Sequence, residues 1–172
     1  MKEKHLLSVL AEDEPGLLGR LLVMLTRRRI EMDSLSMAKT DINSVVLITA
    51  ELLIDAADAK NLQLQISKII EVIKTSLVPT GAILAQKLAF FKLSKDIMDA
   101  PQGNVVQKYG AQIISLYQDA FVISKAGTDA VITELYNKLE GEHLLGFAQT
   151  GMVADSQLLE GNDEWRISQL AA

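Results

Sequence analysis

The feature that most constrains the fold of this 172-residue chain is an order of strand and helix signals that occurs twice. In the first half, short apolar or alternating runs typical of strands separate two stretches whose apolar residues recur at helical spacing. The predicted elements are strand 5–12, helix 16–29, strand 32–39, strand 44–52, a helix after Asp55 or Asp58 with an apolar stripe from Ala59 to Ile73, and strand 71–78. The first half is therefore predicted to be βαββαβ.

The pattern begins again near residue 80, after Pro79 and Gly81. The predicted elements are strand 87–94, a weaker helix ending near Tyr109, strands 111–117 and 120–126, a helix after Thr128, and strand 143–154. Pro101 and Gly103 are expected to break or shorten the first of these helices. The second half therefore repeats the topology of the first, although not its residues.

Two βαββαβ units predict an α+β fold of two ferredoxin-like sandwiches, each a four-stranded antiparallel sheet with two helices on one face. We place the first domain at 1–80, the second at 81–154, and a poorly ordered tail at 155–172. Each sheet then has an uncovered face. Side chains such as Leu7, Val9, Val46 and Ile48 cannot all remain in water, so we expect at least a homodimer, with the first helix and the second strand of the first domain at the interface.

Composition excludes several classes of protein. The chain has no cysteine, which rules out disulfides, thiolate chemistry and zinc fingers and fits a cytoplasmic protein. No apolar run approaches the roughly 20 residues of a membrane span, and the charged N-terminus argues against a signal peptide. A formal charge of −5 counts against broad nucleic-acid binding. We therefore expect neither a membrane nor a nucleic acid as partner.

The sequence offers no catalytic constellation. Its two histidines, His5 and His143, each begin a predicted strand; solvated strand ends are favoured over a metal pair, so no metal site is predicted. No serine has a nucleophile-elbow setting and no glycine-rich segment fits a phosphate loop. The arginines 27–29 end a predicted helix, where the macrodipole favours cations; they are either a solvated helix end or a contact for an anion or a partner. No catalytic residue is predicted.

The strand-to-helix joint at residues 11–18 carries most of the functional signal. Pro15 is predicted at the first helical position, and Gly16 allows close approach of backbone to a ligand. The free N–H groups of Gly16, Leu17 and Leu18 suit a carboxylate, Asp13 suits an ammonium group, and Leu17 with its neighbours supplies an apolar wall. The joint is thus a candidate site for a free amino acid, the alternative being an ordinary strand–helix connection.

The chain also resembles a known family. Residues 12–38, EDEPGLLGRLLVMLTRRRIEMDSLSMA, are similar to the opening of the small, regulatory subunit of acetolactate synthase (acetohydroxyacid synthase). The segments KLAFFKL (87–93), YGAQIISL (109–116) and FAQTGMVADS (147–156) resemble the second half of that family. The resemblance covers roughly residues 4–156.

The resemblance implies an N-terminal ACT domain followed by a second ferredoxin-like domain. Members of the family form a homodimer through their ACT domains, bind valine or a related branched-chain amino acid at that interface, and activate a separate large catalytic subunit. Thiamine diphosphate, magnesium and FAD belong to the large subunit, so no cofactor is expected in this chain. The implied role is allosteric regulation of branched-chain amino acid biosynthesis, including valine feedback inhibition, by a subunit that is not itself an enzyme.

Carried over to this sequence, the effector site comprises two segments, one in the first loop and one on the following strand. Its residues are Asp13, Pro15, Gly16, Leu17, Leu18, Glu31 and Met32. Asp13 and Glu31 stand where the family has asparagine, and Arg29 replaces its usual glycine. A carboxylate only accepts hydrogen bonds, so activation without feedback inhibition, or response to another amino acid, stays open.

Two alternatives belong to other classes of protein: a stand-alone ACT amino-acid sensor, and the effector module of a transcription regulator. Such regulators usually carry a helix-turn-helix, which this sequence does not predict. Under the acetolactate synthase interpretation, residues 86–154 are expected to supply the main contact with the catalytic subunit. The tail, with Trp165, Ile167 and Leu170, would act as a minor clamp.

Overall fold

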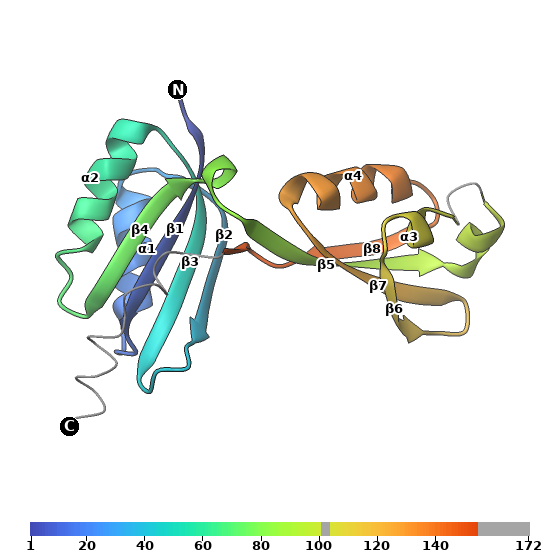
Figure 1. The fold of residues 1–172 in the computed structure, drawn as a ribbon, viewed down its shortest axis with the longest axis horizontal. Helices are drawn as coiled ribbons and strands as arrows, with labels where there is room; N and C mark the ends of the chain where they lie inside the picture. The colour runs from blue at the N-terminus through green and yellow to red at the C-terminus, as the bar shows by residue number, and fades with distance from the viewer. Residues whose placement is uncertain (101–103, 155–172) are drawn as a thin grey trace. The chain divides into compact units, whose positions relative to one another are not determined.

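A computed structural model describes residues 1–100 and 104–154 (Figure 1). Contacts divide the chain into two compact units, which we treat separately. The first unit comprises residues 1–84 together with the segment that begins at Gly151, and the second comprises residues 85–150. No helix within the described ranges is long and apolar enough to cross a membrane.

The first unit has the predicted βαββαβ order. Its elements are β1 (Glu3–Glu12), α1 (Leu17–Arg27), β2 (Glu31–Lys39), β3 (Val45–Ile54), α2 (Ala56–Ile66), β4 (Val72–Pro79) and a 3₁₀ turn, η1 (Thr80–Ala82). The antiparallel sheet has the order β2-β3-β1-β4, so β1 and β3 are central and β2 is an edge strand. Figure 1 shows both helices against one face of this sheet.

Two helix boundaries differ from the predictions. Helix α1 begins at Leu17 and has Gly16, in the left-handed conformation (φ 87°), as its N-cap. Pro15 therefore precedes the helix instead of occupying its first position. Helix α2 is capped by the Asp55 side chain, which accepts from the Asp58 N–H, but it ends at Ile66, and the stripe predicted to reach Ile73 continues into a turn and β4.

The core of the first unit lies between the sheet and its two helices. Leu21 and Leu25 of α1 and Leu62 of α2 pack there against alternate residues of the central strands. Four of those strand residues are Leu7, Val9, Val46 and Ile48. The expectation that these four need a second subunit to cover them is therefore wrong, because the helices of the same chain cover them.

The second unit repeats the topology with a reduced first helix. Its elements are β5 (Ala85–Ser94), the 3₁₀ helix η2 (Lys95–Asp99), α3 (Val105–Lys108), β6 (Gln112–Leu116), β7 (Ala120–Gly127), α4 (Asp129–Leu139) and β8 (Leu144–Gln149). The sheet order is β6-β7-β5-β8. A four-residue α3 agrees with the expected shortening, although Pro101 and Gly103 lie outside the described residues. The α+β class with two βαββαβ units is thus confirmed.

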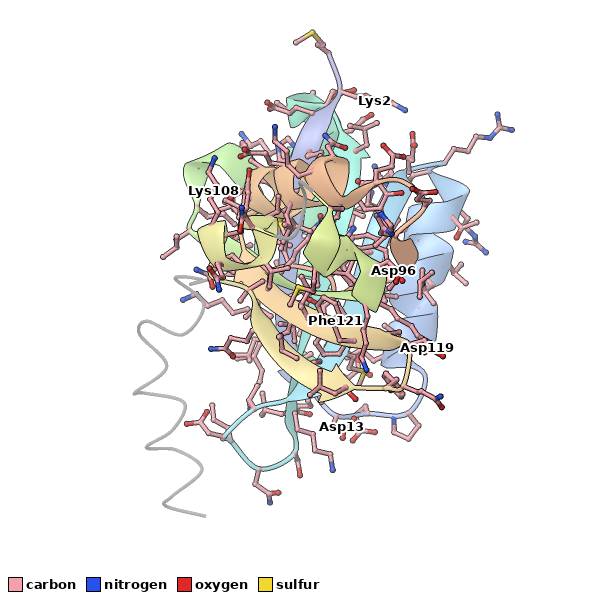
Figure 2. The ribbon with its side chains drawn as sticks, turned by 90° about the vertical axis from the view of Figure 1, so that its right-hand side faces the viewer. Lys2, Asp13, Asp96, Lys108, Asp119 and Phe121 are labelled. Atoms are coloured by element: carbon pink, nitrogen blue, oxygen red, sulfur yellow. The ribbon has the colours of Figure 1, made fainter. Side chains whose placement is uncertain are left out.

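The core of the second unit forms around Phe91, Phe121, Ile123 and Leu135, all 2% exposed or less. Phe121 comes from β7 and is labelled in Figure 2. The strand predicted over 143–154 is divided: β8 ends at Gln149, and a short β9 (Val153–Ala154) follows after Gly151. The tail predicted at 155–172 lies outside the described residues.

The histidines are not both solvated strand ends. His5 is 3% exposed, on the same side of β1 as the core residues Leu7 and Val9, so that prediction is wrong for His5. The side chain of His143 is 24% exposed.

Candidate functional site

The loop between β1 and α1 is held by its own backbone and by the start of β3. The N–H of Asp13 donates to the carbonyl of Ser44 at 2.8 Å, and that of Glu14 donates to Glu12 at 2.9 Å. The N–H of Leu17 donates to the carbonyl of Glu14 at 3.3 Å. Of the three amides predicted to face a carboxylate, the one of Leu17 is therefore already engaged.

The leucines of this joint face the interior. Leu17 is 1% exposed in the core of the first unit, and Leu18 packs partly against that core. The prediction that the Leu17 side chain forms an apolar wall for a ligand is therefore wrong. Pro15 and Gly16 remain exposed.

Gly16 is required for its backbone angle. A Cβ atom added there would meet no heavy atom of the described residues within 4 Å, so no close approach between parts of this chain requires a glycine here. Its φ of 87° lies in the left-handed region that L residues with a side chain disfavour. Gly16 therefore has a conformational role in this structure, and the predicted approach of a ligand to its backbone stays a prediction.

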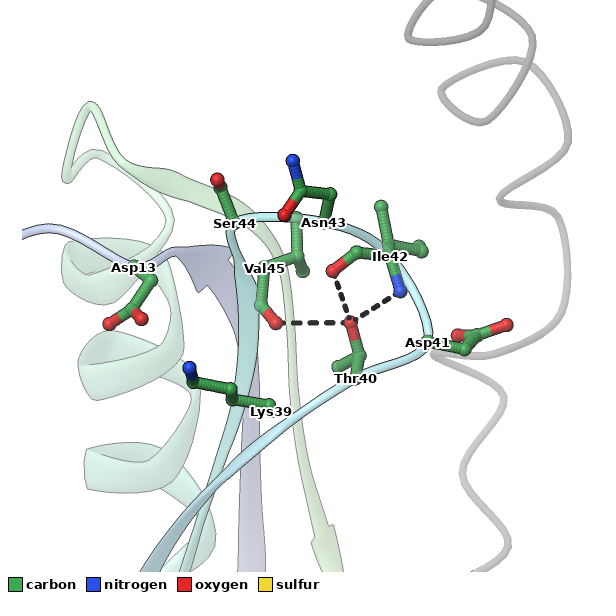
Figure 3. Close-up of a pocket in the computed structure, with 8 residues that line it drawn as sticks. All are labelled: Asp13, Lys39, Thr40, Asp41, Ile42, Asn43, Ser44 and Val45. Carbon is green, nitrogen blue, oxygen red and sulfur yellow. Dashed lines mark hydrogen bonds between the residues drawn. The ribbon is translucent and has the colours of Figure 1, made fainter.

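Asp13 lines a pocket of about 390 Å³ between the β1–α1 loop and the β2–β3 hairpin (Figure 3). The other lining residues come from the end of β2, the hairpin turn and the start of β3: Lys39, Thr40, Asp41, Ile42, Asn43, Ser44 and Val45. In Figure 3 the carboxylate of Asp13 and the amino group of Lys39 lie on the same side of the hairpin. A negative and a positive side chain at one pocket suit a zwitterion.

The hairpin wall of this pocket is braced by Thr40. Its hydroxyl accepts from the N–H of Ile42 at 3.1 Å and lies 3.3 Å and 3.1 Å from the carbonyls of Ile42 and Val45 (Figure 3). Ser44 next to it has a φ of 56°. Lys39 was not among the predicted site residues. The strand register shows that Lys39 belongs to this site. Lys39 lies opposite Val46 and Glu12 lies opposite Val45, so the pairing brings Lys39 near Asp13.

Glu31 and Met32 lie at the other end of the sheet within the same chain. Glu31 pairs with Leu53, whereas Glu12 pairs with Val45, eight positions away on β3. At about 3.3 Å per residue this is roughly 26 Å. One chain therefore does not bring the two predicted halves of the effector site together. Both residues are exposed, on an edge strand.

A second contact ties α1 to the residue that precedes β4. Arg20 forms an ion pair with Glu71 at 2.7 Å, and the backbone carbonyl of Glu71 accepts from the N–H of Glu12 at 2.9 Å. The hydrogen bond from Arg20 holds the pKa of the Glu71 carboxyl below its ordinary value, and a backbone hydrogen bond acts in the same direction. This pair braces the end of β1 from which the loop departs.

Arg29 adopts a φ of 52° directly after α1, in the conformation that favours glycine. Its N–H donates to the carbonyl of Thr26 at 2.9 Å. This explains in physical terms why the resembled family carries glycine here.

Among residues 1–100 and 104–154 there is no group of three or more histidine, aspartate or glutamate side chains that could hold a metal ion.

The fold defines a protein of two βαββαβ units, and the first of them carries a pocket lined by one acidic and one basic side chain, Asp13 and Lys39, beside its first strand–helix joint. No family model matches the chain. Individual curated proteins, however, align with nearly the whole chain. The acetolactate synthase small subunit of Mycolicibacterium smegmatis is 26% identical over 156 residues, covering 89% of this chain and 91% of the relative. A probable acetolactate synthase small subunit of Archaeoglobus fulgidus is 25% identical over 162 residues, covering 92% and 98%.

A solved structure shares the fold. The crystal structure of the acetolactate synthase small subunit from Thermotoga maritima matches with a TM-score of 0.78 at 20% identity, covering 88% of this chain and 96% of that one. The resemblance drawn from the sequence is confirmed: this chain is similar to proteins named acetolactate synthase small subunits over about nine tenths of its length, and it shares the fold of one of them.

Proposed function

We propose that this chain is the regulatory subunit of an acetolactate synthase, which it binds and activates in the cytoplasm for branched-chain amino acid biosynthesis. The observation that carries the proposal is the alignment with proteins named small subunits of acetolactate synthase over about nine tenths of both chains. Thiamine diphosphate, magnesium and FAD would be held by the large catalytic subunit, and this chain would supply regulation.

The effector proposal requires two copies of the chain. Strand β2 is an edge strand of nine residues, and an uncovered edge of this length is a template for another strand. A two-fold axis through the middle of β2 would pair it antiparallel with its counterpart. The partner's Glu31 and the partner's Met32 would then lie beside Lys39, at the end of the sheet where Asp13 is found.

A homodimer of this kind completes a site for a free amino acid. Asp13 and the partner's Glu31 would accept hydrogen bonds from the ligand ammonium group, since both are carboxylates. Lys39 and the amides of Gly16 and Leu18 would bind the ligand carboxylate. The partner's Met32, 38% exposed in one chain, would contact an aliphatic side chain. The proposed effector is therefore valine, leucine or isoleucine.

The activation experiment tests the proposal as a whole. The catalytic large subunit from the same organism is purified alone and together with this chain, and acetolactate formation from pyruvate is measured with thiamine diphosphate, magnesium and FAD. We expect the two chains to elute together and the specific activity to rise. Separate elution with unchanged activity would overturn the proposal.

A further inference from the structure

Glu51 is a carboxylate buried in the first unit. It lies in the middle of β3 and is 1% exposed. Its neighbours Ala50 and Leu52 belong to the core beneath the helices. Because side chains alternate along a strand, Glu51 lies on the opposite, helix-free face of the sheet.

Two donors from distant parts of the sequence converge on one oxygen of this carboxylate. The hydroxyl of Ser34, on β2, donates to Glu51 Oε1 at 2.6 Å. The backbone N–H of Met152 donates to the same oxygen at 3.2 Å. A buried carboxylate is costly unless it accepts hydrogen bonds, so these donors account for its place in the sheet.

Gly151 shows how closely the returning chain approaches β2. A Cβ atom at this position would lie 2.8 Å from the hydroxyl oxygen of Ser34 and 3.2 Å from its Cβ. A side chain at this position would have to displace the Ser34 hydroxyl or move the two segments apart. The chain leaves the second unit after Thr150, and the residues from Gly151 onward belong to the first unit. The return crossing of the chain is therefore packed directly on β2.

Strand β2 is the element that a ligand or a second strand would contact. It is an edge strand, and its pairing with β3 shifts register between Met32 and Ser34, immediately before the Glu51 contact. A bulge at an edge is a place where a strand can adjust its path. A ligand or a second strand bound to Glu31 and Met32 would thus act within three residues of Ser34.

We propose that Glu51 is a positioning residue that couples β2 to the return crossing at Gly151 and Met152, so that events on β2 reach the second unit. The identity of the signal rests on the proposed function, in which β2 contributes to the dimer and to the effector site. The coupling itself rests on the Ser34–Glu51–Met152 contact.

Hydrogen exchange in the full chain tests the coupling without any ligand. Ser34→Ala removes one hydrogen-bond donor to Glu51 and leaves residue 152, whose amide is measured, unchanged. Ser36→Ala is the matched control: Ser36 contacts the Thr49 hydroxyl at 2.8 Å between the same two strands. We expect exchange of the Met152 amide to become about tenfold faster in Ser34→Ala and to stay within about twofold in Ser36→Ala, since about 1.4 kcal/mol corresponds to tenfold. Equal exchange in the two variants would overturn the coupling.

A second experiment, which measures enzyme activity, distinguishes a role of Glu51 in transmitting effector binding from a role in stability alone. With the catalytic large subunit present, we expect Ser34→Ala to bind valine within about twofold of the unmodified chain, while the response of acetolactate synthase activity to valine falls at least about fivefold. A full valine response in Ser34→Ala would overturn the proposal. If the unmodified chain neither activates the large subunit nor binds valine, the proposed function fails, and the exchange measurement alone decides whether β2 and Met152 are coupled.

Discussion

Arg20 on α1 and Glu71 ahead of β4 form a 2.7 Å ion pair that ties the first helix to the end of the central strand β1, through the Glu71 carbonyl and the Glu12 amide. Glu12 is the last residue of β1 before the candidate effector loop, and Arg20 lies within the segment 12–38 that resembles the family. The ion pair therefore links the stability of the fold to the shape of the loop.

The pH dependence of this pair has a definite sign. The pKa of Glu71 is lowered from its ordinary value of 4.5, first by the hydrogen bond from Arg20. A lowered folded-state pKa contributes stability that is fully present above about pH 4.5 and is lost as the pH falls through the folded-state value. We expect Glu71→Gln to lose less stability than the unmodified chain in that interval, as measured by urea unfolding at several pH values. Arg27→Gln, at the exposed end of the same helix, should leave the pH dependence unchanged.

Substituting alanine for Gly16 in the first loop and for Gly19 in α1 should change the free energy of unfolding in opposite directions. Gly16→Ala places a side chain at a φ of 87° and should lower the free energy of unfolding by about 1–2 kcal/mol. Gly19→Ala, inside α1 with open space at its Cβ position, should raise it by about 0.5–1 kcal/mol. Denaturant unfolding of both variants checks this. A neutral Gly16→Ala would show that the loop adopts another conformation.

The overall fold could be predicted from the sequence because both units follow apolar periodicity. The leucine stripe of α1 and the β-branched run of β3 are both found in the structure. The joint between β1 and α1 could be predicted less well. Pro15 and Gly16 indicate a turn, but only the structure shows that Gly16 is the N-cap and that the helix begins at Leu17. The inward orientation of Leu17 likewise comes from its burial in the structure.

The candidate site could be predicted only in part, because it depends on long-range strand register. The sequence identifies Asp13 in the loop but not Lys39, which β2–β3 pairing brings to the same pocket. Glu31 was included in the predicted site only because of the family resemblance. Within one chain it lies at the far end of the sheet. Glu51 could not be singled out, since its partner Met152 is 101 residues away.

The proposed dimer predicts a concentration-dependent molecular mass. Light scattering should give twice the chain mass at micromolar concentration. Met37 is 40% exposed on the edge strand β2, so Met37→Asp should place charges close to the pairing axis and favour the monomer. Leu64→Asp, 53% exposed on α2, is the control and should remain dimeric. A stable monomer of the unmodified chain would contradict the β2 interface.

The zwitterion site predicts which residues control effector affinity. Calorimetry should detect valine, leucine or isoleucine with a Kd between micromolar and millimolar, roughly −8 to −4 kcal/mol. Asp13→Ala and Lys39→Met should each weaken binding about tenfold or more, because each removes one charge partner of the ligand. Lys60→Met on α2 should bind normally. Binding that is unchanged in both pocket variants would place the effector elsewhere.

The surface that meets the catalytic subunit is expected on the second unit, because the first unit would be occupied by dimerisation and effector. On β5, Leu88 and Phe90 alternate with the core residues Ala89 and Phe91 and stay 40% and 43% exposed on the helix-free face. Together with Ala148, Gln149 and Thr150 they line an apolar recess of about 230 Å³. Apolar aromatic side chains of this kind often dominate the binding energy of interfaces.

Phe90→Asp should therefore abolish co-elution with the large subunit and its activation, while dimerisation and amino acid binding persist. The thermal midpoint should change little, since the side chain is already partly in water. Leu116→Asp, 72% exposed on the edge strand β6, provides the matched control and should activate normally. Full activation by Phe90→Asp would move the contact away from this face of the second sheet, and loss of activation in both variants would show that it extends to the β6 edge.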